Sequence, residues 1–244
     1  MDERSAQAPI SRFWSTTALD YEAHKDNVAT EGSEEFAAWV EALRTLLPPA
    51  PADVLDVGTG TGFAARIAAG LGHRVTGIDL AEGMLGAARS AARSQGVDVD
   101  FREGDAVAPP FADASFDAVV SRHLLWTLRE PTKAFENWGR LLRAGGRAIA
   151  VDGLWFSGES AAEAEGEDAP GLFEQHYTKN VRLELPIMAL TSVEPVGDMF
   201  RAAGFESVNV SALGTVRVAG RVPYAVVASG WKGTAVGEDA RPGS

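Results

Sequence analysis

Val54-Leu55-Asp56-Val57-Gly58-Thr59-Gly60-Thr61-Gly62 is the stretch that decides the fold of this 244-residue chain. A short apolar run typical of a buried strand leads into three glycines at alternate positions, and residues 63–71 follow with a helical pattern. Glycines between a strand and a helix let the backbone turn tightly and approach a ligand closely. The stretch therefore predicts a ligand-binding loop; the alternative is a plain strand-to-helix turn.

Strand and helix patterns alternate around this loop. Strands are predicted at residues 54–57, 75–79, 99–101, 116–121, 148–151, 208–213 and 224–231. Helices are predicted at residues 33–47, 63–71, 81–95, 131–142 and in a stretch that ends at Gly204, where Thr191 and Glu194 have the spacing of a capping box. Gly145 and Gly146 are predicted to turn the chain into the fifth strand. This order predicts an α/β fold, a doubly wound, mostly parallel seven-stranded sheet with helices on both faces.

The chain divides into three predicted parts. Residues 1–48 form an N-terminal helical cap that contributes to a substrate pocket, with Ser33 capping the helix of residues 33–47. Residues 49–232 form the ligand-binding domain, in which the small, acidic and polar stretch 157–170 is predicted to be a mobile loop. Residues 233–244 are predicted to be a flexible tail.

Composition and charge exclude several function classes. The net charge is −12, and nucleic-acid binding depends largely on Lys and Arg neutralising phosphates, so no nucleic-acid partner is expected. The chain has no cysteine, which removes disulfides, thiolate metal sites and cysteine nucleophiles. No signal peptide pattern and no apolar run long enough to span a bilayer are visible, so a cytoplasmic protein with no membrane partner is expected.

Asp79 ends the second predicted strand, seventeen positions after Gly62. A carboxylate at this position is suited to accept hydrogen bonds from both hydroxyls of a ribose; the alternative is a cap for the following helix. Phe63 stands where a dinucleotide fingerprint requires a third glycine, and Asp56 would repel a pyrophosphate but attract an ammonium group. Asp105, in Gly104-Asp105-Ala106, could accept from the exocyclic amine of an adenine. These details favour S-adenosylmethionine (SAM) over NAD.

The motifs, taken in order, resemble those of class I SAM-dependent methyltransferases, most closely the small-molecule branch. The resemblance rests on Val54–Gly62, Gly77-Ile78-Asp79, Gly104-Asp105, Ser115–Val119 and Leu142–Gly146, and covers about residues 50 to 152. It implies a Rossmann-like SAM-binding domain with an antiparallel strand at the C-terminal edge. It also implies a set of cofactor-binding residues: Tyr21, Asp56, Gly58, Thr59, Gly60, Asp79, Leu80, Met84, Gly104, Asp105, Ala106 and Ser121.

Four segments are expected to meet at the carboxyl ends of the strands, where ligands bind in this architecture. They are the N-terminal stretch with Phe13, Trp14 and Tyr21, the run Arg122–Trp126, the pair Trp155-Phe156 and the pair His176-Tyr177. The expected substrate-pocket residues are Trp14, His123, Trp126, Trp155 and His176. For each of them, packing or a hydrogen bond to a carbonyl is the alternative interpretation. His123 is the candidate base or positioning donor.

The resulting hypothesis is an enzyme that transfers the methyl group of SAM to an O, N or C atom of a small-molecule acceptor, in a setting such as secondary metabolism. S-adenosylhomocysteine would be the product, no metal is expected, and the protein would be a monomer or homodimer. The alternatives are an NAD-dependent oxidoreductase and a non-catalytic SAM-binding protein on the same fold.

Overall fold

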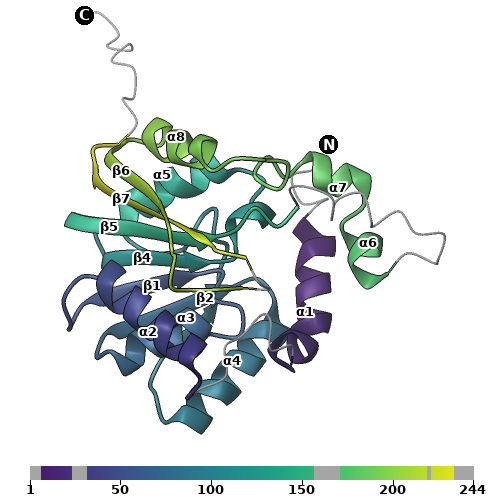
Figure 1. The fold of residues 1–244 in the computed structure, drawn as a ribbon, viewed down its shortest axis with the longest axis horizontal. Coiled ribbons are helices and arrows are strands. Elements are labelled where there is room, and N and C mark those ends of the chain that lie inside the picture. Colours follow the sequence, from purple (N-terminus) through teal and green to yellow (C-terminus); the bar gives the residue numbers. More distant parts are fainter. Residues whose placement is uncertain (1–6, 24–31, 157–170, 219–220, 234–244) are drawn as a thin grey trace, which may run out of the picture.

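The computed structural model describes residues 7–23, 32–156, 171–218 and 221–233. Its centre is a seven-stranded sheet in the order β3-β2-β1-β4-β5-β7-β6 (Figure 1). The strands β1 to β5 pair in parallel, and β7 lies antiparallel between β5 and β6. The strands are β1 (Asp53–Val57), β2 (Arg74–Asp79), β3 (Asp100–Glu103), β4 (Phe116–Arg122), β5 (Leu142–Asp152), β6 (Phe205–Ala212) and β7 (Tyr224–Trp231). The predicted fold class and the antiparallel C-terminal strand are confirmed.

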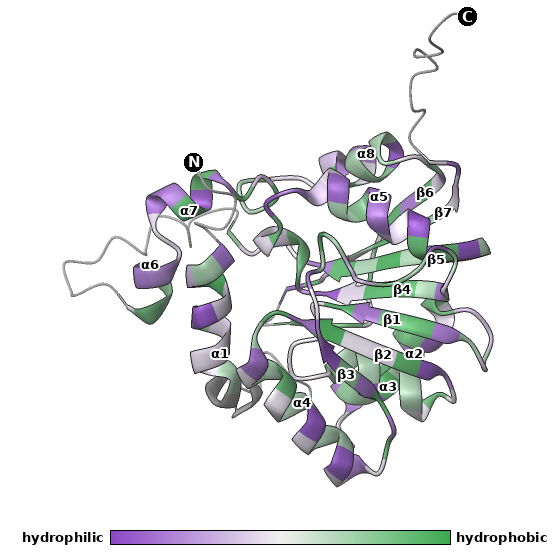
Figure 2. Ribbon diagram, turned by 180° about the vertical axis from the view of Figure 1, so that it is seen from behind, coloured by the Kyte–Doolittle hydropathy of each residue, from purple (hydrophilic) through white to green (hydrophobic). Residues whose placement is uncertain are grey.

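Helices cover both faces of the sheet (Figure 1). One buried apolar cluster contains residues of β1, β4, α5 and α8, and the other contains residues of α2, α3 and α4 with the opposite sides of the same central strands. Figure 2 shows that hydrophobic residues dominate these central strands, while α4 carries hydrophilic residues on its outer side. The helices are α1 (Gln7–Ala23), α2 (Glu34–Leu46), α3 (Phe63–Gly70), α4 (Glu82–Gln95), η1 (Leu125–Thr127), α5 (Pro131–Leu141), α6 (Leu172–His176), α7 (Lys179–Leu183) and α8 (Glu194–Ala202).

The caps of two helices test the sequence interpretation. Ser33 caps α2 as predicted, because its hydroxyl accepts from the backbone N–H of Phe36 at 3.1 Å. The predicted capping box of Thr191 and Glu194 is wrong, because α8 begins at Glu194 itself and is preceded by Val193 without a side-chain cap. The physical reason is Pro195: its missing N–H is tolerated in the first turn of a helix, and a start at Thr191 would have moved it beyond that turn.

Two further boundaries differ from the expectation. The pair Gly145-Gly146 does not separate a helix from a strand, since β5 already begins at Leu142 and passes through both glycines, with a register shift against β4 between Phe116 and Ala118. The short helices η1, α6 and α7 were not predicted. The predicted acidic loop at 157–170 lies outside the described residues, as does the predicted tail apart from Gly233. Within the described ranges, no helix combines the length and the apolar character that a membrane span requires.

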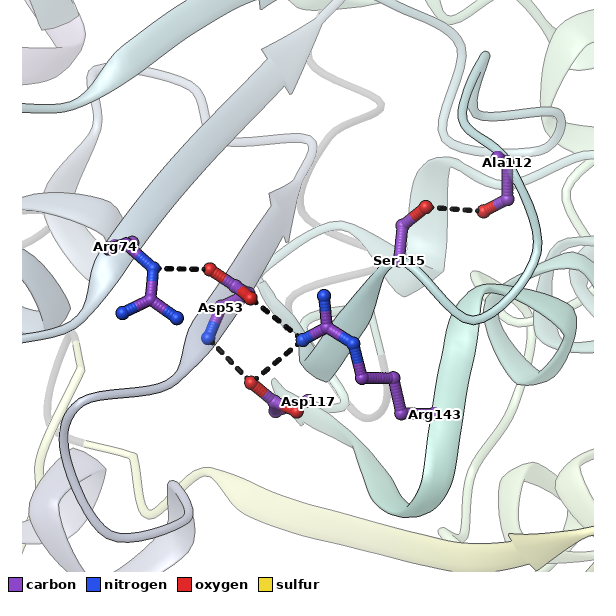
Figure 3. A network of polar contacts seen from close by, with 6 residues as sticks. All are labelled: Asp53, Arg74, Ala112, Ser115, Asp117 and Arg143. Atoms are coloured by element: carbon purple, nitrogen blue, oxygen red, sulfur yellow. Dashed lines mark hydrogen bonds and ion pairs between the residues drawn. The ribbon is translucent and has the colours of Figure 1, made fainter.

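Four charged side chains join the amino ends of the central strands (Figure 3). Asp53 of β1 accepts from Arg74 of β2 at 2.6 Å and from Arg143 of β5 at 2.7 Å. Asp117 of β4 accepts from Arg143 at 3.0 Å and from the backbone N–H of Asp53 at 2.8 Å. These partly exposed contacts tie four strands at the edge opposite to the carboxyl ends. The hydrogen bond from Arg74 is the main cause of the lowered pKa of Asp53.

We expect Asp53→Asn to lower the free energy of unfolding at pH 7 by about 1 kcal/mol, a small value because the pairs are partly exposed. Since the folded-state pKa of Asp53 lies below the ordinary value of 3.8, its stabilising contribution is present above pH 3.8 and is lost as the pH falls through the folded-state pKa. Urea unfolding at several pH values should therefore show a difference from wild type that shrinks below this range. Asp113→Asn, at the more exposed pair with Arg140, is the control. A difference that persists at pH 2 would contradict the assignment.

Candidate functional site

A cavity lies at the carboxyl ends of β1 to β4, beneath α1. Its empty space measures about 960 Å³, counting the part that is open to solvent. Most of the predicted cofactor residues line it: Tyr21, Asp56, Gly58, Thr59, Gly60, Asp79, Leu80, Met84, Gly104, Asp105 and Ala106. Trp14 and His123, predicted for the substrate pocket, line the same cavity. The structure thus brings residues that are spread from Gln7 to Arg129 along the sequence into one concave surface.

The glycine loop forms the floor of the cavity. Gly58, Gly60 and Gly62 have φ values of +62°, +55° and +79°, in the region that favours glycine. A Cβ at Gly58 would overlap the side chain of Leu124, whereas a Cβ at Gly60 would meet no atom within 4 Å. Gly58 is therefore required for packing beneath the loop, and Gly60 presents bare backbone to the cavity.

The carboxylate of Asp79 anchors this loop. One oxygen accepts from the N–H of Gly60 and the other from the N–H of Ala81, both at 2.9 Å. Burial raises the pKa of Asp79, and these backbone hydrogen bonds act in the opposite direction. Each carboxylate oxygen has a second lone pair, so Asp79 can still accept from a ligand. The helix-cap interpretation and the ligand interpretation of Asp79 are therefore compatible.

Asp56 is a buried carboxylate in the same cavity, with only 1% of its surface exposed. Its Oδ2 accepts from the hydroxyl of Thr59 at 2.7 Å and from the N–H of Ala65 at 3.1 Å. Its Oδ1 has no hydrogen-bond partner among the described residues. Burial raises the pKa of Asp56 to about 7, despite the opposing effect of these hydrogen bonds. A buried acceptor atom without a partner is costly for the protein alone, and a cationic ligand group would satisfy it.

The opposite wall comes from the ends of β2 and β3. The N–H of Gly104 donates to the carbonyl of Asp79 at 3.1 Å. This hydrogen bond holds the segment after β3 against Asp79, the residue that also anchors the glycine loop. The Oδ1 atom of Asp105 accepts from the N–H of Val107 at 2.8 Å, so one carboxylate oxygen shapes its own turn. Leu80 and Met84 add apolar surface on the α4 side of the cavity. This combination suits a flat heterocycle with polar edges.

The helix α1 forms the roof. Trp14 and Tyr21 line the cavity and contact each other edge to face, with ring centres 5.6 Å apart. Ala18 packs on Ala81 and Met84 at the start of α4. The indole N–H of Trp14 donates to the hydroxyl of Tyr177 at 2.8 Å, which connects α1 to the residue that follows α6. Residues of α1 therefore form part of the lining of the cavity.

His123 lies directly after β4 in a strained position, with φ at +56°. Its ring stands between Trp39 and Trp155, with ring-centre distances of 6.2 and 4.9 Å. Burial, and secondly the neighbouring Arg122, hold the pKa of His123 well below its ordinary value. Its Nε2 atom is buried and lacks a hydrogen-bond partner in the described part of the chain. The surroundings therefore favour a neutral imidazole and disfavour the imidazolium that a base would become.

Four predicted site residues do not line the cavity. Ser121 is fully buried in β4, and its hydroxyl has no hydrogen-bond partner among the described residues. The indole N–H of Trp155 donates to Asp152 at 2.7 Å, which draws this residue toward β5. Trp126 packs against Tyr177 and Phe156 within an aromatic cluster above the cavity. His176 has its Nδ1 atom 3.0 Å from the carbonyl of Leu172 within α6. For Trp126, Trp155 and His176, the packing or carbonyl interpretation describes the observed contacts.

Two further residues belong to this region: the sequence places Arg122 in a segment expected at the site without giving it a role, and it leaves Asp152 open as a catalytic residue or a cap for the next turn. Arg122 lines the cavity next to His123. Asp152 is fully buried and accepts from the N–H groups of Leu125 and Gly153 and from Trp155, and burial raises its pKa to about 6. The signal for Arg122 was available, since a charged residue follows directly after a buried strand on the side where ligands bind. Within the described ranges, no group of three or more His, Asp or Glu side chains is placed to hold a metal ion.

Comparisons with known proteins agree with this geometry. A family described as a methyltransferase domain matches residues 55–150. A demethylmenaquinone methyltransferase of Thermus thermophilus is 37% identical over 46% of this chain and 51% of its own length. Another, from Clavibacter sepedonicus, is 32% identical over 69% of this chain and 71% of its own. The chain thus spans about half the length of the first relative and more of the second.

Comparison with solved structures also finds methyltransferases. A SAM-dependent methyltransferase structure from Aquifex aeolicus superposes with a TM-score of 0.56 at 23% identity, covering 80% of this chain and 90% of its own, which is a likeness of fold. The order of the motifs, the sheet topology, the cavity and the similarity to the relative from Clavibacter sepedonicus lead to one conclusion. The chain belongs to the class I SAM-dependent methyltransferase family.

Proposed function

We propose that this protein binds SAM in the cavity beneath α1 and transfers its methyl group to a small-molecule acceptor. The observation that carries the proposal is that Asp56 lines the cavity while its buried Oδ1 atom has no hydrogen-bond partner among the described residues. An ammonium group of the methionine moiety would satisfy this atom. The relatives support the choice of reaction, because they are named as methyltransferases that act on demethylmenaquinone, a small molecule.

The other cavity residues fit the remaining parts of SAM. Asp79 would hold the ribose hydroxyls with its second lone pairs while it keeps Gly60 in place. Leu80 and Met84 would contact the adenine on one side, and Asp105 and Ala106 would meet its edge. The bare backbone of Gly60 would allow the ligand to approach closely. The acidic chain would act in the cytoplasm, as a monomer or homodimer.

SAM supplies a methyl group already activated by its sulfonium. The protein therefore has to align an acceptor with this methyl group and exclude water, and a base is needed only for an acceptor that must lose a proton early. The environment of His123 argues for a neutral, positioning side chain rather than a base, because its protonation is opposed by burial and by Arg122. The wall of Trp14, Tyr21 and Phe63 provides apolar surface for the acceptor.

An oxidoreductase that uses NAD is disfavoured by the same geometry. A pyrophosphate would have to approach the glycine loop, where Asp56 adds a buried carboxylate that becomes negative near pH 7. Phe63 occupies the start of α3, where a dinucleotide site uses a third glycine for close packing. Both features are compatible with a sulfonium ligand that carries an ammonium group.

Isothermal titration with SAM and S-adenosylhomocysteine, with NADH as the comparator, tests the proposal directly. We expect micromolar binding of the first two ligands and no heat from NADH. Protein with SAM bound can then be offered a panel of phenolic and quinol acceptors, with formation of S-adenosylhomocysteine as the measured product. NADH binding without SAM binding would contradict the proposal, and SAM binding without turnover on any acceptor would favour the non-catalytic alternative.

We expect Asp79→Ala to weaken SAM binding by about 1–3 kcal/mol, because charge-assisted hydrogen bonds to the ribose and the anchor of Gly60 are lost together. Isothermal titration of the folded variant measures the effect. Asp100→Ala removes a carboxylate from the exposed start of the neighbouring strand β3 and serves as the control, with unchanged affinity expected. Equal affinities for wild type and Asp79→Ala would remove Asp79 from the cofactor site.

SAM affinity should fall as the pH is lowered below about 7. The raised pKa of Asp56 means that the free protein holds a proton there below pH 7, and the ammonium group of SAM requires the carboxylate form, so binding must release this proton. Between pH 5.5 and 7 we therefore expect proton release in titrations with buffers of different ionisation enthalpy. Asp56→Asn separates this effect from the other cavity carboxylates, and it should bind weakly without this pH dependence. A flat affinity profile for wild type would contradict the role of Asp56.

A further inference from the structure

Arg122, at the end of β4, is a cation inside the cavity that the proposed function has not yet used. Its guanidinium carbon lies 4.8 Å from the ring centre of Trp39 and 4.4 Å from that of Phe63. Both aromatic side chains are buried, with 1% and 3% of their surface exposed. Two cation–π contacts from buried rings fix the position of the guanidinium and shield it from water.

The charged and polar groups around Arg122 come from three elements. Its guanidinium donates a hydrogen bond to the hydroxyl of Tyr21 in α1, and Asp56 and Asp152 act on it electrostatically. The carboxylate of Asp152 is already engaged by Leu125, Gly153 and Trp155. Burial lowers the pKa of Arg122, but arginine stays charged in proteins at neutral pH. The cavity therefore contains a fixed positive charge close to the negative charge of Asp56.

Asp56 and Arg122 carry opposite charges and line one cavity. Together they match a ligand that carries a positive and a negative group close to each other. The α-amino acid end of SAM has an ammonium and a carboxylate on the same carbon. We propose that Arg122 holds the α-carboxylate of SAM while Oδ1 of Asp56 accepts from its ammonium group. This inference rests on the proposed function, because it assigns a second residue to the same cofactor.

The second arginine in the cavity provides a contrast. Arg129 lines the cavity from the segment between η1 and α5. Asp56 of β1 pairs in register with Val120 of β4, two positions before Arg122, whereas Arg129 follows η1. Because the two charges of an amino acid are only a few bonds apart, the cation that binds its carboxylate must lie close to Asp56. Arg122 meets this requirement, so Arg129 serves as a control within the same cavity.

Three ligands separate the parts of SAM. Decarboxylated SAM keeps the sulfonium and the ammonium but lacks the carboxylate, and 5′-methylthioadenosine lacks the amino acid charges altogether. We expect wild type to bind SAM about 10- to 100-fold more tightly than decarboxylated SAM, as a charge-assisted pair predicts. Arg122→Gln should remove this preference by weakening SAM alone, with 5′-methylthioadenosine affected little. Arg129→Gln should keep the wild-type preference.

Isothermal titration gives these affinities, and circular dichroism checks the fold of each variant. If Arg122→Gln does not fold, Arg122→Lys keeps the buried charge but loses the planar pair of donors, so a reduced preference is expected and an unchanged one would overturn the inference. No preference in wild type, or an equal loss for SAM and decarboxylated SAM in Arg122→Gln, would overturn it as well. Failure of wild type to bind SAM at all would instead refute the proposed function.

Discussion

The cavity depends on one carboxylate, that of Asp79, which joins the loop after β1 to the start of the helix after β2. Without this bridge, the N–H of Gly60 would lack its acceptor, and the loop would lose its attachment to the neighbouring strand. The carbonyl of Asp79 also receives the N–H of Gly104, so the third wall is attached to the same residue. One residue at the end of β2 therefore sets the relative position of three loops.

The charged side chains at the amino ends of the strands differ in their surroundings from those at the carboxyl ends. At the amino ends, Asp53, Asp117, Arg74 and Arg143 satisfy one another. At the carboxyl ends, burial raises the pKa values of Asp56, Asp79 and Asp152, because their charged forms lose hydration that the protein replaces only in part. The charged groups at the amino ends are paired with one another, whereas Oδ1 of Asp56 at the carboxyl ends has no partner among the described residues, as expected when a site is completed by a ligand.

The sequence predicted what local motifs determine. The order of strands and helices, the glycine loop, Asp56 and Asp79 follow from residue types at fixed spacing after a strand, so their placement in one cavity could be expected. Trp155 and His176 were expected in the substrate pocket but do not line the cavity, because Trp155 donates to Asp152 and His176 lies near a carbonyl of its own helix. Thr191 was misleading because Pro195, four positions later, decides where the helix can begin. Arg122 was expected near the site without a role, because only its contacts with the rings of Trp39 and Phe63, distant in sequence, show that its charge is held inside the cavity.

Gly83, in the first turn of α4, illustrates how a remote segment constrains the domain. A Cβ at this position would lie 2.9 Å from the Cα atom of Ser15, so the backbone of α1 rests directly on the backbone of α4. No larger residue fits at position 83 unless the roof over the cavity moves away. Related sequences that lack the N-terminal helix would be free to vary at this position, while those that retain it would not. The size of the residue at position 83 in α4 therefore determines whether α1 can pack over the cavity.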